Sequence, residues 1–363
     1  MAETMKAQVF YEQEKMLLED IPVPAVGPEQ VLVLVKFCGI CGSDVAYFFG
    51  DSSLETETGA GPLVLGHEFS GEVVEVGDIP KRAGLFKPGD RVTLDPVQYC
   101  NACKICKKGQ VNLCENKDVL GVSVNGGFAQ YCVSLYTGLH KIPENITYAE
   151  AAMTEPLACA VNAVRKMAIQ PGDFCVVIGP GAIGIMMVQL IKRCGAGKAV
   201  LIGRAGNDYR LEMGLGLGAD VIINIGDSSS PYYVSDLKAK IAELSDGQLA
   251  DTVITPTGAV EAMESAFDIS GRQARIVFFG LPADNAVVRV PAAQTIFQDK
   301  TVHFSWLAQL TWPTALDAIA RGLVDVKSLA SSTIELKDLQ QGLRDVKARA
   351  GQPMKVLVKP PGP

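Results

Sequence analysis

Near residue 170 the sequence changes from short apolar runs to a regular alternation of strand and helix patterns. An apolar run at 174–178 leads into a helical stretch that ends near Cys194. Further short apolar runs, separated by helical patterns such as 260–269, follow at 199–202, 221–224, 252–254 and 275–279. Parallel strands must be joined by long crossovers, usually helices. This alternation therefore predicts an α/β domain with a parallel, doubly wound sheet.

The first part of the chain has a different pattern. From about 6 to 150 it is rich in short β-branched runs, such as 31–35, 71–76 and 90–94, punctuated by Gly and Pro. Such runs predict antiparallel strands that close into a barrel or sandwich. After about 300 the chain offers two helical patterns and a last strand at 355–358. That segment is too short to fold alone, so we expect it to return to the first domain.

Length and composition agree with two globular domains. A chain of 363 residues exceeds the usual size of one core, and 48% hydrophobic with 20% charged residues is an ordinary globular balance. The net charge is -7, and the acidic residues are scattered rather than clustered. These features argue against nucleic acid or an acidic membrane as partner.

One segment is long enough to be tested as a membrane span. Residues 174–191 carry no charge, but Gly179, Pro180, Gly181 and Gly184 interrupt them. A strand, a tight turn and a buried helix explain the segment better, so we predict no membrane span. The first residues lack the apolar core of a signal peptide, and we expect a cytoplasmic protein.

Four of the ten cysteines follow a compact pattern, Cys100-x2-Cys103-x2-Cys106-x7-Cys114. Four thiolates at such spacings can surround one tetrahedral Zn²⁺ and leave no position open for a substrate. An iron–sulfur cluster is also possible on spacing alone, whereas four buried free thiols fit poorly in so short a loop. The pattern favours a structural zinc site in a reducing compartment.

Other candidate metal ligands are dispersed, namely Cys41, His67 and Glu155. One thiolate, one imidazole and one carboxylate would form a neutral site with Zn²⁺, which keeps the metal Lewis-acidic. Each residue also has an ordinary structural interpretation: a redox pair or buried thiol with Cys38, a structural His, and a Glu at a helix start before Pro156. Spacing alone leaves both interpretations open.

A glycine-rich turn joins the strand at 174–178 to the following helix. The residues predicted to contact a dinucleotide there are Gly179, Gly181, Ala182, Ile183 and Gly184. Glycines let the backbone approach a pyrophosphate, whose charge then meets the helix N-terminus. The context of strand and helix makes this pattern specific.

The end of the next strand bears on the choice of cofactor. Enzymes that use NAD usually carry an acid there, which binds the ribose hydroxyls. This chain has Gly203 and Arg204, a small residue beside a guanidinium, which favours the 2′-phosphate of NADP. In the alternative, Arg204 belongs to a solvated loop and Asp208 supplies the acid.

Several segments together resemble the zinc-dependent medium-chain dehydrogenases. They are the four-cysteine pattern, 39–44 (Gly-Ile-Cys-Gly-Ser-Asp), 66–73 (Gly-His-Glu-x2-Gly-x-Val), 87–92 (Lys-x-Gly-Asp-Arg-Val) and 154–157 (Thr-Glu-Pro-Leu). The resemblance continues into the cofactor half, and Glu155 in place of a second Cys is similar to the polyol (sorbitol-type) branch. It implies a GroES-like β-barrel catalytic domain and a Rossmann domain, with the active site in the cleft between them. The expected limits are 1–155 with a zinc lobe at 97–116, then 156–298, and a return segment at 299–363.

The same resemblance assigns roles to the dispersed residues. It implies that Cys41, His67 and Glu155 bind a catalytic zinc, the second metal of the chain. Glu68 should be an outer or exchanging carboxylate, and Ser43 should accept the proton of the substrate alcohol.

Two departures from the polyol pattern concern the proton route and the substrate. Ala46 replaces a His that can pass the proton outward, so the relay should end in water or ribose. Leu307 and Ala308 align with an Arg-Tyr pair of the sorbitol type, which makes sorbitol itself doubtful.

The resemblance therefore implies an NAD(P)-linked oxidoreductase of secondary alcohols or polyols, with NADP favoured. A threonine- or 2,3-butanediol-type dehydrogenase of the same fold is the first alternative. A cofactor-binding protein without catalysis is a second, and occupied ligand positions speak against it. A homotetramer, or else a dimer, is expected.

Overall fold

The computed structural model describes residues 3–362, which form two compact units. Unit 1 comprises the chain up to Pro156, Trp312–Ala320 and the chain from Val326 onward. Unit 2 comprises Leu157–Thr311 and Arg321–Asp325. Each unit has its own buried apolar core.

Unit 1 is built mainly from antiparallel strands, as the β-branched runs predict. Its larger sheet has the order β10-β6-β5-β3-β18-β17, and β9 also pairs with β3. A smaller sheet has the order β2-β1-β4, and β7 pairs with β8. The strands are β1 (Thr4–Glu12), β2 (Lys15–Pro22), β3 (Gln30–Gly39), β4 (Leu63–Val64), β5 (Glu68–Val76), β6 (Arg91–Leu94), β7 (Val97–Gln98), β8 (Asp118–Val119), β9 (Tyr131–Leu135), β10 (Leu139–Lys141), β17 (Ala330–Glu335) and β18 (Lys355–Lys359).

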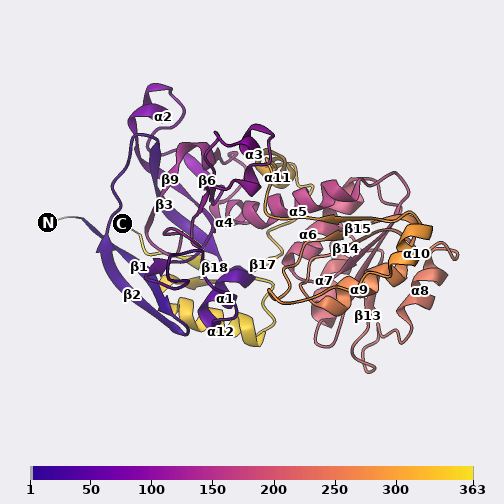
Figure 1. The fold of residues 1–363 in the computed structure, drawn as a ribbon. Coiled ribbons are helices and arrows are strands. Elements are labelled where there is room, and N and C mark those ends of the chain that lie inside the picture. Colours follow the sequence, from indigo (N-terminus) through magenta and orange to yellow (C-terminus); the bar gives the residue numbers. More distant parts are fainter. Residues whose placement is uncertain (1–2, 363) are drawn as a thin grey trace. The chain divides into compact units, whose positions relative to one another are not determined.

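The C-terminal segment completes the larger sheet of unit 1. Strand β18 pairs with β3, so the last strand of the chain lies beside one of the first (Figure 1). The helices that contribute residues to unit 1 are α1 (Gly42–Phe49), α2 (Asp78–Arg82), α3 (Lys104–Lys107), α4 (Tyr148–Ala152), α5 (Thr154–Met167), α11 (Trp312–Ala320) and α12 (Leu339–Ala348). Helix α5 begins in unit 1 and continues into unit 2.

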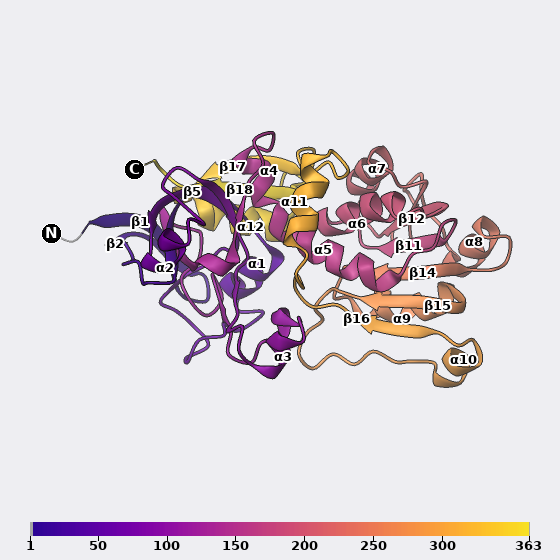
Figure 2. The same cartoon turned by 90° about the horizontal axis from the view of Figure 1, so that it is seen from above.

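Unit 2 is a six-stranded sheet in which every neighbouring pair is parallel. The order β13-β12-β11-β14-β15-β16 is the 3-2-1-4-5-6 order of the Rossmann fold. The strands are β11 (Phe174–Ile178), β12 (Lys198–Gly203), β13 (Val221–Asn224), β14 (Ala250–Thr255), β15 (Ser270–Phe278) and β16 (Thr301–Phe304); Figure 2 shows the last three side by side. The remaining helices are α6 (Ala182–Arg193), α7 (Asp208–Gly216), α8 (Leu237–Leu244), α9 (Val260–Ile269) and α10 (Ala292–Phe297).

The fold class predicted from the sequence is confirmed, but the end of the second unit differs from the expected limit at residue 298. Strand β16 pairs with β15 and so belongs to unit 2, which continues to Thr311. The sequence of β16, Thr-Val-His-Phe, alternates polar and apolar residues over only four positions, which is the shortest run that predicts a strand. Among the described residues, no helix has the length and hydropathy that a membrane crossing requires.

Candidate active site and metal centres

The four clustered cysteines of unit 1 converge on one point. They lie in the loop between β7 and β8, and their Sγ atoms are all within 4.8 Å of one another. The Sγ atoms of Cys100 and Cys114 are 3.5 Å apart, and those of Cys103 and Cys114 are 4.0 Å apart. The loop also turns backbone N–H groups toward the sulfurs, as Cys103 N–H does toward Cys100 Sγ at 3.3 Å.

These distances fit a single zinc ion. Zn–S bonds of about 2.3 Å in tetrahedral geometry hold the sulfurs about 3.8 Å apart. An iron–sulfur cluster binds its cysteines through separate iron atoms and would hold them farther apart. Backbone N–H groups of Ala102 and Cys103 lower the pKa of Cys100 to about 6, which favours the thiolate that a metal requires. The residues present therefore suit a closed, structural zinc site.

A second cluster gathers Cys41, His67 and Glu68, whose ligand atoms also lie within 4.8 Å of one another. Cys41 is the N-cap of α1, His67 precedes β5, and Glu68 is the first residue of that strand. His67 and Glu68 are buried. A thiol, an imidazole and a carboxylate together are a donor set that zinc prefers.

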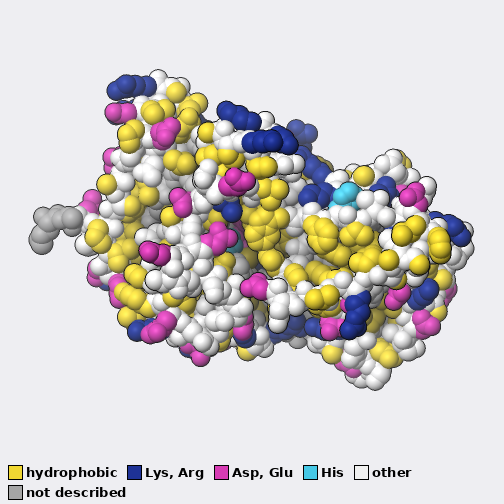
Figure 3. All heavy atoms as spheres, viewed as in Figure 1, with side chains coloured by type: hydrophobic (Ala, Val, Ile, Leu, Met, Phe, Trp, Pro, Cys, Tyr) yellow, Lys and Arg dark blue, Asp and Glu magenta, His cyan; other side chains and the backbone are white. Residues whose placement is uncertain are grey.

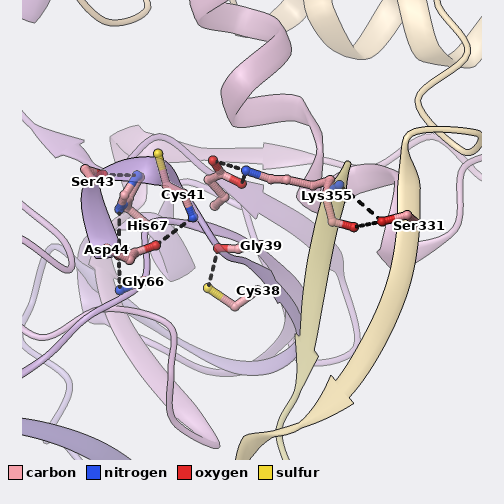
Figure 4. A network of polar contacts seen from close by, with 10 residues as sticks. Cys38, Gly39, Cys41, Ser43, Asp44, Gly66, His67, Ser331 and Lys355 are labelled. Carbon is pink, nitrogen blue, oxygen red and sulfur yellow. Dashed lines mark hydrogen bonds and ion pairs between the residues drawn. The ribbon is translucent and has the colours of Figure 1, made fainter. Parts of the chain in front are cut away.

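Asp44 holds the parts of this second cluster in place. Its side chain accepts hydrogen bonds from Cys41 N–H at 2.8 Å and from Gly66 N–H at 3.3 Å, so it joins α1 to the loop that carries His67 (Figure 4). Its Oδ1 also lies 3.6 Å from His67 Nδ1. A histidine that binds a metal through one nitrogen usually has a carboxylate or carbonyl beside the other. With Asp44 beside Nδ1, the other ring nitrogen of His67, Nε2, is the one suited to bind a metal.

The electrostatics of the cluster favour a cation. Burial by itself lowers the pKa of His67, but Asp44 and Cys41 raise it and the net direction is upward. Ser43 Oγ lies 3.4 Å from His67 Nε2 and is only partly buried. The serine predicted to handle the proton is therefore next to the candidate metal position.

Glu155 is buried in the first turn of α5, where its charge raises the pKa of His67 and of Lys355. It thus lies close to the second cluster, but the tight group of three contains Glu68 instead. The ligand role predicted for Glu155, and the outer role predicted for Glu68, stay predictions.

The glycine-rich turn of unit 2 has the expected form. Gly179, at φ +135°, directly follows β11, and Gly181 is the N-cap of α6. A Cβ on Gly184 would lie 1.9 Å from the carbonyl oxygen of Gly179, so only glycine lets the helix pack this closely on the turn. A Cβ on Gly181 would meet open space, where a phosphate can approach the free N–H groups that open α6.

Arg204 and Asp208 differ in the contacts that their side chains make with the rest of the protein. The Arg204 side chain is exposed and makes no hydrogen bond or ion pair within residues 3–362. Asp208 Oδ1 accepts hydrogen bonds from Asn224 Nδ2 at 2.7 Å and from Ser230 Oγ at 2.9 Å, which anchor the loop after β13. Gly203 is tightly packed, because a Cβ there would lie 3.0 Å from Pro180 Cγ.

Comparisons with known proteins agree with this architecture. Residues 27–144 match the family model of the alcohol dehydrogenase GroES-like domain, and residues 182–321 match that of the zinc-binding dehydrogenases. A D-arabitol-phosphate dehydrogenase of Enterococcus avium is 33% identical over 95% of this chain and 94% of its own length. A sorbitol dehydrogenase of Halalkalibacterium halodurans is 32% identical over 94% of this chain and 95% of its own.

Three solved structures are similar over nearly the whole chain. A zinc-binding dehydrogenase of Sinorhizobium meliloti bound to NADP is 28% identical with a TM-score of 0.86, and 99% of this chain and 100% of that one are covered. An alcohol dehydrogenase of Escherichia coli with NADH is 28% identical with a TM-score of 0.87, covering 98% and 99%. The 2R,3R-butanediol dehydrogenase of Bacillus subtilis is 28% identical with a TM-score of 0.85, covering 98% and 100%.

These matches, together with the two metal-ligand clusters, identify the class. The chain belongs to the zinc-dependent medium-chain alcohol dehydrogenase family, and it is an enzyme that acts on CH–OH groups.

Proposed function

We propose that the enzyme transfers hydride between a secondary alcohol or polyol and NAD(P). The observation that carries this proposal is the convergence of Cys41, His67 and Glu68 beside the Ser43 hydroxyl. The sorbitol and D-arabitol-phosphate relatives support a polyol substrate, whereas the butanediol dehydrogenase supports a smaller diol. Oxidation rates of polyols, phosphorylated polyols, 2,3-butanediol and L-threonine with both cofactors would test it. Oxidation of none of these alcohols with either cofactor would contradict it.

Each residue of the candidate site has a part in this reaction. Cys41 and His67, with Glu155, would hold the catalytic zinc. When bound, zinc supplies a Lewis acid that lowers the pKa of the substrate hydroxyl. Asp44 orients the His67 ring, and the Gly179–Gly184 turn would hold the pyrophosphate of the cofactor.

Ser43 would accept the proton of the substrate alcohol. We expect Ser43→Ala to lower kcat by about 10²- to 10⁴-fold with little change in substrate Kd, because the hydroxyl acts only as the proton leaves. Ser43→Thr, which keeps the hydroxyl, is the matched control. Steady-state kinetics and substrate binding distinguish the two effects. Unchanged turnover in Ser43→Ala would mean that the proton leaves by another route.

NADP is the proposed preferred cofactor. Arg204 is exposed and without a protein partner among the described residues, so it is available to a 2′-phosphate, while Asp208 is engaged in its own loop. We expect Arg204→Ala to weaken NADP binding by about 10- to 150-fold and to leave NAD almost unchanged, since a charge-assisted hydrogen bond contributes about 1.5–3 kcal/mol.

Calorimetric titration with each cofactor measures this effect. Arg272→Ala, which removes the same charge from another exposed position of unit 2, should alter neither affinity. An equal loss for NAD and NADP in Arg204→Ala would refute the preference. Substitution of Gly203 is less suitable, because its Cβ would crowd Pro180.

A second copy of the chain is the proposed macromolecular partner. Strand β16 is the edge of its sheet, and large apolar side chains beside it are exposed, with Phe304 at 73% and Phe297 at 80% (Figure 3 shows hydrophobic groups over β15 and α10). Exposed edge strands and apolar patches favour self-association. Light scattering of the purified enzyme distinguishes tetramer, dimer and monomer, and a monomeric mass would refute this proposal.

A further inference from the structure

Lys355 is a buried cation that the sequence motifs do not account for. It opens β18, its side chain is almost fully enclosed, and its Nζ forms an ion pair with Glu68, lying 2.5 Å from Oε1 (Figure 4 shows Lys355). Burial lowers the pKa of Lys355, but Glu68, Cys41 and Glu155 together raise it above its usual value, so the ammonium form is favoured. A buried charge is tolerated only with such a partner.

Strand pairing brings the two charges together from distant parts of the sequence. Strand β3 pairs with β5 at Gly39 and Glu68 and with β18 at Gly39 and Leu357. Ser331 on β17 fixes the backbone of Lys355, because its Oγ donates to Lys355 C=O at 3.0 Å and accepts from Lys355 N–H at 3.3 Å. The lysine therefore has little freedom to move away from Glu68.

Gly39 provides the space in which the ion pair lies. A Cβ on Gly39 would fall 2.3 Å from Glu68 Oε2 and 3.1 Å from Lys355 Cε. Gly39 does not have a positive φ, so no unusual backbone conformation explains the glycine. Because glycine has no side chain, the Glu68 carboxylate has room to lie toward Lys355.

Lys355 balances an excess of negative charge around the proposed metal site. The proposed ligands Cys41 and Glu155 together neutralise a Zn²⁺ ion. Glu68 adds a further negative charge whose carboxylate is within 4.8 Å of the Cys41 and His67 ligand atoms. Two cations then compete for that carboxylate, the metal and Lys355. If the metal won, Glu68 would be a fourth protein ligand, and a metal that also held a solvent or substrate oxygen would be five-coordinate.

We propose that Lys355 is a positioning residue that holds Glu68 beside the catalytic metal rather than on it, and so limits the metal to three protein ligands. This inference rests on the proposed zinc site, and it extends to residues far from the metal-binding motifs. Loss of the ammonium group would release Glu68 to become a permanent ligand. Glu68 is near enough to bind the metal in either case, so the ion pair with Lys355 would decide the coordination number of the metal.

Absorption spectra of the Co²⁺-substituted enzyme test this directly, because five-coordinate Co²⁺ absorbs more weakly in the visible region than tetrahedral Co²⁺. We expect Lys355→Met to weaken the visible bands and to slow metal loss to a chelator by about tenfold, the scale of such outer contacts. The four-cysteine site contributes equally to every variant and cancels in difference spectra. Lys355→Arg should retain the spectrum of the unchanged enzyme.

A double variant keeps the test decisive if Lys355→Met alone does not fold. Lys355→Met with Glu68→Gln removes both buried charges, and we expect it to fold and to regain the tetrahedral spectrum. An unchanged spectrum in folded Lys355→Met, or a five-coordinate spectrum in the double variant, would overturn the inference. Absence of the second metal from the unchanged enzyme would instead overturn the proposed function.

Discussion

Cys41→Ser should give a folded protein in which turnover is lost. The Lewis acid contributes several kcal/mol, and each 1.36 kcal/mol is tenfold, so we expect kcat to fall by about 10³-fold or more. The variant should contain one zinc per chain where the unchanged enzyme contains two. Its Tm should change little, because Cys41 is a helix cap at the edge of the core and its thiol forms no disulfide.

The matched control is Cys194→Ser, an exposed free thiol in unit 2. It should keep full activity and both metal ions. Elemental analysis measures the zinc content of the two variants, and steady-state kinetics measures their turnover. Full activity in Cys41→Ser, or a single zinc in the unchanged enzyme, would contradict the assignment of a catalytic metal at Cys41.

Cys100→Ser should act on stability rather than directly on chemistry. The four thiols hold a lobe whose own apolar cluster is small, limited to Val111 and the cysteines with Tyr99 packed against them. Metal binding must therefore supply most of the folding free energy of this lobe. We expect Tm to fall by roughly 10 °C, since loss of a bound metal belongs to the largest class of single-residue effects.

Calorimetry measures the Tm of the Cys100→Ser variant, and metal analysis measures its zinc content. The variant should retain the catalytic zinc and lose the structural one, which is the reverse of Cys41→Ser. Cys194→Ser again serves as the control and should melt with the unchanged enzyme. Equal Tm and two zinc ions in Cys100→Ser would contradict the structural site.

The sequence predicted the fold class and the four-cysteine site well because both depend on local spacing. The alternation of strand and helix patterns after residue 170 predicted the parallel sheet, and its strand order confirms a Rossmann unit. Four cysteines between Cys100 and Cys114 can meet only if the loop closes on itself, and it does. In both cases neighbouring residues determine the geometry.

Less could be predicted about what surrounds the candidate catalytic site. Asp44 was part of a recognised segment, yet nothing in that segment indicated that its carboxylate bridges Cys41 and Gly66. The engagement of Asp208 with Asn224 and Ser230 was equally hidden, because the latter two residues follow a different strand. Backbone pairing had to be known before these contacts could be expected.

Lys355 shows the difference between what the sequence patterns predict and what the tertiary structure adds. From the sequence it was the first residue of a final strand, and Glu68 was an acid beside a predicted ligand; 287 positions separate them. Sequence patterns by themselves determined which segments form strands, helices and metal loops, because those depend on residues a few positions apart. Only the tertiary structure decided that Lys355 meets Glu68 over Gly39, because β3 pairs with β5 on one side and β18 on the other.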